Sequence, residues 1–97
     1  MIRVLIVEDQ MLVCEGLEML LNVVEDIRVA GHATDGAEAL CAIEKLRPDV
    51  VLLDVRMPKM SGIDVLREMK ARALTAPVIL LTTFNDDAAL LDRKSVV

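Results

Sequence analysis

Runs of apolar residues alternate along this chain with segments in which apolar residues recur at helical spacing. The apolar runs cover Ile2–Val7, Ile27–Thr34, Val50–Leu53 and Val78–Leu81. A continuous apolar run that stops at turn residues is typical of a strand covered on both faces, as in parallel sheets. The second run contains Gly31 and is less apolar, so we expect its strand to lie nearer the edge of the sheet.

The first helical segment follows Asp9, which we expect to cap its N-terminus. Its apolar positions recur at intervals of one to four residues, and they are Val13, Leu17, Leu20, Leu21 and Val24. Asp35-Gly36 introduces a second helix over Ala37–Lys45, which ends at Arg47-Pro48. The apolar side of this second helix consists of Ala39, Leu40 and Ile43.

A third helix is indicated after the loop that contains Pro58 and Gly62. Its apolar positions are Ile63, Leu66 and Met69, and we expect it to stop around Ala73. A shorter helical segment over residues 85–91 follows the last apolar run.

Strands and helices therefore alternate with short connections over the whole chain. This alternation produces a parallel sheet with right-handed crossovers and helices on both faces. We predict an α/β fold, a flavodoxin-like doubly wound parallel sheet with strand order 2-1-3-4. The 97 residues form a single domain.

Acidic residues stand where two of the predicted central strands end. Glu8 and Asp9 follow the first strand, and Asp54 ends the third. These strands are neighbours in the predicted order, so the three carboxylates should meet at one rim of the sheet. Carboxylates at such close range repel one another unless some are protonated or a cation binds, and oxygen ligands suit Mg²⁺. Thr82, after the fourth strand, would add a hydroxyl beside Asp54.

The remaining composition narrows the classes of function. The net charge of −5 and the pI near 4.7 argue against direct binding of nucleic acid. We see no signal peptide and no apolar run of membrane-spanning length, so we expect a cytoplasmic protein that does not enter membranes. Cys14 and Cys41 lack metal-binding spacing and are interpreted as reduced thiols.

Four motifs, in order, carry a family resemblance. They are VLIVEDQ, Asp35-Gly36-Ala37-Glu38-Ala39, RPDVVLLDVRMPKMSG and APVILLTT. Together they resemble the receiver domain of bacterial two-component response regulators, most closely the transcriptional regulators with a LuxR-type helix-turn-helix. The resemblance extends from Ile2 to about Leu91.

The resemblance implies a phosphorylation-controlled signalling switch and not an enzyme that turns over substrate. Asp54 would accept a phosphoryl group from the phosphohistidine of a sensor histidine kinase. Asp9, Asp54 and the backbone carbonyl of Arg56 would ligate Mg²⁺, with Glu8 supporting the metal through water. Thr82 would be the hydroxyl that turns toward the aspartyl phosphate. In intact relatives this switch would control dimerisation, DNA binding and transcription.

The chain departs from the family pattern at its end. The family continues into a fifth strand with a characteristic lysine and then a fifth helix. Lys94 comes only twelve residues after Thr82, so we do not assign the phosphoryl-binding role to it, and residues 92–97 form an atypical tail. We expect residues 1–97 to be an incomplete, C-terminally truncated receiver domain. The DNA-binding helix-turn-helix domain would be absent, and most of the dimerisation surface missing.

Three alternatives remain open beside the receiver module. A truncated fragment could be non-functional. A phosphatase with an aspartate nucleophile, of the haloacid-dehalogenase type, needs a second aspartate two residues after the first, and that position is Arg56. A flavin- or nucleotide-binding module needs a glycine- or hydroxyl-rich loop after the first strand, where this chain has EDQMLV.

We expect this chain on its own to be unstable or to aggregate. The fourth helical segment is too short to stand alone, and Val78–Leu81 would form an open apolar edge of the sheet. Size-exclusion chromatography and thermal unfolding of the purified chain test this expectation. A monomer with a sharp, reversible thermal transition would contradict it.

Overall fold

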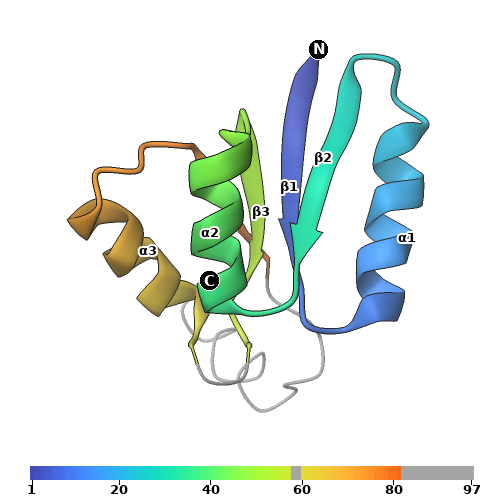
Figure 1. Ribbon diagram of the computed structural model, residues 1–97. Helices are drawn as coiled ribbons and strands as arrows, with labels where there is room; N and C mark the ends of the chain where they lie inside the picture. The colour runs from blue at the N-terminus through green and yellow to red at the C-terminus, as the bar shows by residue number, and fades with distance from the viewer. Residues whose placement is uncertain (58–59, 82–97) are drawn as a thin grey trace, which may run out of the picture.

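The computed structural model describes residues 1–57 and 60–81, in which four strands alternate with three helices (Figure 1). The elements are β1 (Ile2–Val7), α1 (Met11–Asn22), β2 (Ile27–Ala33), α2 (Gly36–Leu46), β3 (Val50–Asp54), α3 (Gly62–Ala71) and β4 (Val78–Leu81). The predicted strands and three helices are therefore present. The helical segment predicted over residues 85–91 and the tail at 92–97 lie outside the described residues.

All the strand pairings in the described part of the chain are parallel, and the strand order is β2-β1-β3-β4. This order confirms the predicted flavodoxin-like arrangement, with β2 at an edge. In the pairing of β1 with β3, Val7 lies opposite Leu53, so the two strands end side by side. Asp54 lies opposite Leu81, at the end of β4. The register therefore brings the carboxyl ends of β1, β3 and β4 to one rim.

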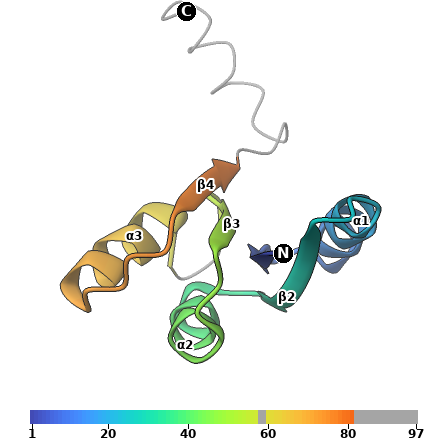
Figure 2. The same cartoon turned by 90° about the horizontal axis from the view of Figure 1, so that it is seen from above.

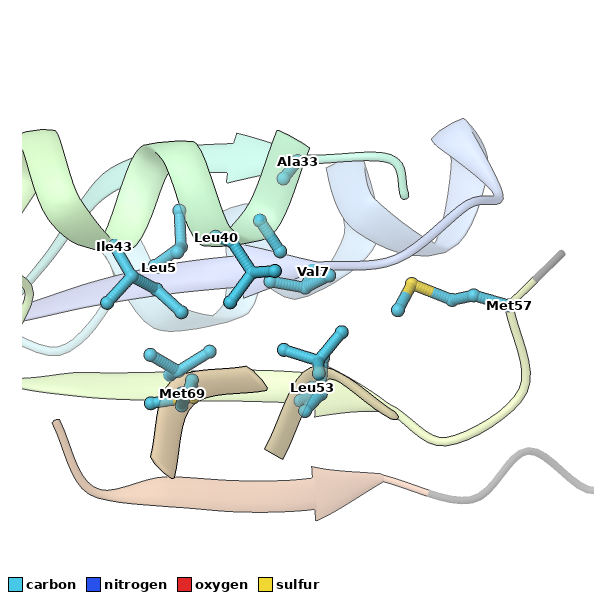
Figure 3. Packing of buried hydrophobic residues seen from close by; sticks show 11 residues of the cluster. Leu5, Val7, Ala33, Leu40, Ile43, Leu53, Met57 and Met69 are labelled. Atoms are coloured by element: carbon cyan, nitrogen blue, oxygen red, sulfur yellow. The ribbon is translucent and has the colours of Figure 1, made fainter. Parts of the chain in front are cut away.

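The helices cover the two faces of the sheet unequally (Figures 1 and 2). The apolar side chains of α2 and α3 pack on one face with those of β1 and β3, and the buried members include Leu5, Val7, Ala39, Leu40, Ile43, Val51, Leu53, Val65 and Met69. Met57 reaches into this cluster from the loop after β3 (Figure 3). On the opposite face α1 packs through Cys14, with Val4 and Ile6 of β1 beneath it. Aliphatic and sulfur-containing side chains alone fill both clusters.

The apolar side of α1 differs from the prediction. Cys14 is buried, whereas Leu20 is 70% exposed and Val24 is 46% exposed. The helix ends at Asn22, so Val24 lies beyond it. Each residue of a helix is rotated by about 100° from the one before it, which turns Leu20 away from the half-buried Leu21. The predicted apolar positions thus cover a wider part of the helix surface than the face that packs on the sheet.

The predicted N-cap of α1 is also wrong. The N-cap is Gln10, one residue later than Asp9, and its side chain makes no capping hydrogen bond. Asp9 instead lies in the link between β1 and α1, beside the other acidic residues at the strand ends. In the described residues we find no helix with the length and apolar character that crossing a bilayer requires.

The buried side of α3 is shifted from the predicted one. Val65 is fully buried together with Gly62 and Met69, while Ile63 is 41% exposed. Positions spaced by three residues drift around the helix, because one turn takes 3.6 residues. Intervals of three and then four residues keep positions 62, 65 and 69 on one face. The period of the α-helix therefore selects Val65 and not Ile63 for the core.

Replacing these two residues in parallel tests the assignment. Val65→Ala removes buried methyl groups and leaves a cavity, so we expect it to lower the free energy of unfolding by about 2 kcal/mol. Ile63→Ala at the exposed position should change it by less than about 0.5 kcal/mol. Urea unfolding followed by circular dichroism gives both values. Equal losses in the two variants would contradict the assignment.

Candidate functional site

Three carboxylates meet at the rim where β1 and β3 end. Glu8 directly follows β1, Asp9 comes next in the link to α1, and Asp54 is the last residue of β3. One carboxylate oxygen from each residue lies within 4.8 Å of the other two. The backbone N–H of Glu8 also donates to the carbonyl of Ala33, at the end of β2, over 3.0 Å. The convergence expected from the sequence is therefore present in the structure.

The members of this acidic cluster differ in their exposure. Glu8 and Asp54 are each only 1% exposed, whereas Asp9 is exposed. Burying a carboxylate removes its hydration, and a second negative charge nearby adds repulsion. The cluster is therefore a buried pair of acids with a third acid at its solvent side, which gives a cation or a proton an approach from solvent.

Two backbone amides hold the buried carboxylates in place. The N–H of Gln10 donates to Oε1 of Glu8, and the N–H of Arg56 donates to Oδ1 of Asp54, each over 3.1 Å. In both cases the donor comes two residues after the acid, where the chain turns at the end of a strand. Sequence reasoning missed these donors, although an acidic residue followed by a turn is a known signal for such a bond.

Burial raises the pKa of the Glu8 carboxyl to about 7. The hydrogen bond from Gln10 opposes this shift, while the negative charge of Asp54 and hydrogen bonds to Asp54 and Asp9 add to it. Near neutral pH, the Glu8 carboxyl is therefore only partly ionised. A cation that binds the cluster would take the place of the carboxyl proton.

Gly62 allows the first turn of α3 to lie directly behind Asp54. A Cβ at this position would lie 2.9 Å from the carbonyl oxygen of Asp54 and 2.9 Å from Cα of Val55. Its N–H donates to the carbonyl of Val55 over 3.0 Å. Ser61 and Asp64 form a capping box that starts the helix here. Glycine is needed at this position for space, whereas the sequence alone indicates only a loop residue.

The other predicted site residues stand as follows. Arg56 is exposed and follows Asp54 by two residues. The role of its backbone carbonyl as a metal ligand stays a prediction. Thr82 lies outside the described residues, as does Lys94. Thr82 directly follows Leu81, whose partner in the sheet register is Asp54.

The donor set of the acidic cluster fits a hard divalent cation. In the described part of the chain, the residues gathered at this rim that could hold a metal are carboxylates, with no thiol or imidazole among them. Oxygen-only ligands with net negative charge are what Mg²⁺ prefers. The negative charge of Asp54 adds to the raised pKa of Glu8, and a cation bound between the two carboxylates would relieve that repulsion.

The pKa of Glu8 predicts how stability varies with pH in metal-free solution. The unfolded chain releases this proton near pH 4.5 and the folded chain near 7, so stability should fall as pH rises through this window. Glu8→Gln cannot ionise, so as the pH rises from 4.5 to 8 it should gain stability over wild type by about 3 kcal/mol.

Urea unfolding at several pH values in the presence of EDTA measures this difference. Glu15→Gln, at an exposed position of α1, is the matched control and should follow the wild-type curve. Parallel curves for wild type and Glu8→Gln would contradict the raised pKa.

Comparisons with known proteins agree with this fold. A family model described as the response regulator receiver domain matches residues 4–95. The uncharacterized transcriptional regulatory protein YvfU of Bacillus subtilis is 46% identical over 84 residues, which are 87% of this chain and 42% of YvfU. A protein-glutamate methylesterase/protein-glutamine glutaminase of Pyrococcus abyssi is 40% identical over 95 residues, which are 98% of this chain and 26% of that relative. The chain thus spans less than half the length of both relatives.

Comparison with a solved structure also indicates a response regulator. The DNA-binding response regulator of the LuxR family from Staphylococcus aureus superposes with a TM-score of 0.79 at 29% sequence identity, over 98% of this chain and 79% of that one. The family match leaves out only the first three and the last two of 97 residues. The chain therefore belongs to the response regulator receiver domain family of two-component systems.

Proposed function

We propose that this chain is the phosphoacceptor module of a two-component phosphorelay, and that Asp54 takes a phosphoryl group from the phosphohistidine of a sensor histidine kinase. The observation that carries this proposal is the position of Asp54. It is a buried carboxylate at the end of β3, held by the N–H of Arg56, with Glu8 and Asp9 close by.

In the proposed transfer, a carboxylate oxygen of Asp54 forms a bond to phosphorus. The bond from phosphorus to the imidazole nitrogen of the donor breaks, and that nitrogen keeps the electron pair. The N–H of Arg56 orients the carboxylate through its bond to Oδ1, and the close packing of Gly62 fixes the backbone of Asp54 from behind. The chain contributes mainly positioning, on which phosphoryl transfer depends.

We assign the metal site to Asp9, Asp54 and the backbone carbonyl of Arg56, with Glu8 acting through water. When bound there, Mg²⁺ would neutralise charge on the phosphoryl oxygens. The convergence of three carboxylates supports this assignment, because a cation among them would relieve the repulsion between Glu8 and Asp54. Thr82 completes the proposed site as the hydroxyl that turns toward the aspartyl phosphate.

The output of the switch is proposed from the relatives. YvfU and the staphylococcal protein are named as transcriptional and DNA-binding regulators, so we propose that phosphorylation of the aspartate at this position controls transcription in intact relatives, through a helix-turn-helix domain. The net charge of −5 gives these residues no electrostatic attraction to DNA of their own. We place this signalling in the cytoplasm, and we regard the module as a switch that gains and loses its own phosphoryl group.

Phosphorylation by a small donor tests the role of Asp54. The chain is incubated with Mg²⁺ and acetyl phosphate, or with a phosphorylated kinase, and examined by intact mass spectrometry. We expect one base-labile phosphoryl group, which is lost when EDTA replaces Mg²⁺ and in Asp54→Asn. Asp26→Asn is the matched control, because Asp26 is exposed and precedes β2 at the opposite end of the strands.

Other results would contradict the proposal. A folded chain that forms no adduct would indicate a non-functional fragment. An adduct that persists in Asp54→Asn would place the acceptor elsewhere. Continuous hydrolysis of phosphate esters over many turnovers would indicate a phosphatase.

A further inference from the structure

Gly36 makes a close contact with the loop that follows the proposed phosphoacceptor. It is the first residue of α2, which begins at the same end of the sheet where β1 and β3 finish (Figure 1). A Cβ on Gly36 would lie against the sulfur of Met60, 2.7 Å from its Cγ and 2.8 Å from its Cβ. The backbone of Gly36 does not have a positive φ, so the position needs glycine for space and not for conformation.

Local hydrogen bonds hold the start of α2 together. Oδ1 of Asp35 accepts a hydrogen bond of 2.8 Å from the N–H of Glu38. The carboxylate of Glu38 in turn accepts one of 3.1 Å from the N–H of Thr34. Gly36 itself is buried, and Met60 packs against the core cluster shared by α2 and α3. A side chain at position 36 would therefore clash with Met60, and through the Cβ of Met60 it would press on the backbone before α3.

A short series of contacts leads from Met60 to Asp54. Met60 precedes Ser61, the N-cap of α3, and Gly62 then donates its N–H to the carbonyl of Val55. Val55 is joined to Arg56, whose N–H holds Oδ1 of Asp54. Displacing Met60 would thus pull on the turn that orients the carboxylate.

We propose that Gly36 is a positioning residue for Asp54. By leaving space for Met60, it anchors the residue before the N-cap of α3 to the N-terminus of α2 and so sets the turn over Asp54–Arg56. This inference rests on the proposed function for its effect on phosphoryl transfer. Its effect on the loop itself is independent of that function.

A double-mutant cycle tests the contact. Gly36→Ala should slow phosphorylation by acetyl phosphate about tenfold, since misplacing a reacting group by a fraction of an ångström has effects of this size. It should also speed hydrogen exchange in the peptide that contains Arg56, by roughly threefold or more. In a Met60→Gly background the clash is absent, so Gly36→Ala should have no further effect on either rate.

Gly16→Ala is the matched control. Gly16 also lies in a helix, but a Cβ there would have nothing within 4 Å. This variant should leave both rates as in wild type. Should Gly36→Ala fail to fold, the proposal requires the double variant with Met60→Gly to fold again.

The results separate this inference from the proposed function. If wild type takes up no phosphoryl group, the proposed function fails, and hydrogen exchange still decides the positioning role. Wild-type exchange in Gly36→Ala would overturn the inference. It would also be overturned if the effect of Gly36→Ala persisted unchanged in the Met60→Gly background, or if the double variant did not fold.

Discussion

The fold places two acidic side chains, Glu8 and Asp54, out of water at the ends of adjacent strands, and the properties of the rim follow from this constraint. Burial disfavours the charged form of Glu8, and the negative charge of Asp54 adds repulsion. The backbone amides of Gln10 and Arg56 offset part of this cost, and the rest appears as the raised pKa of Glu8. A cation bound among these carboxylates would relieve the repulsion between them.

The parallel topology provides this placement without any local sequence signal linking the two residues. β1 and β3 are adjacent in the sheet but are separated in the chain by a complete strand and two helices. Their apolar runs end opposite each other, at Val7 and Leu53, so the first polar residues after them must meet. Gly36 and Gly62 add a second requirement, since Gly36 leaves room for Met60 and Gly62 lets α3 begin against the backbone of Asp54 and Val55. The acids and the loop beside them are thus fixed by the same rim of the sheet.

The strands, their order and the convergence of the acids could be predicted from the sequence, because they follow from apolar runs and from general rules of parallel sheets. The details that failed depend on how each helix rotates onto the sheet. Leu20 and Ile63 were predicted to face the core and are exposed, while Cys14 and Val65 fill it. The capping role expected of Asp9 also failed, because α1 begins later than the acidic pair suggested. The pKa of Glu8 could not be predicted, since it depends on burial by residues distant in the sequence. The role of Thr82 stays a prediction.

The proton on Glu8 and the proposed phosphorylation of Asp54 must influence each other, because their carboxylates belong to one cluster. A phosphoryl group on Asp54 would replace one negative charge with a larger one beside a group that is already half-protonated near pH 7. The cluster would then favour positive charge still more strongly, either as a proton on Glu8 or as a cation retained next to Asp9. Metal binding, proton binding and phosphorylation would be linked at this rim, so that a change in any one shifts the equilibrium of the other two. The exposed position of Asp9 provides the side from which proton and cation could exchange with solvent.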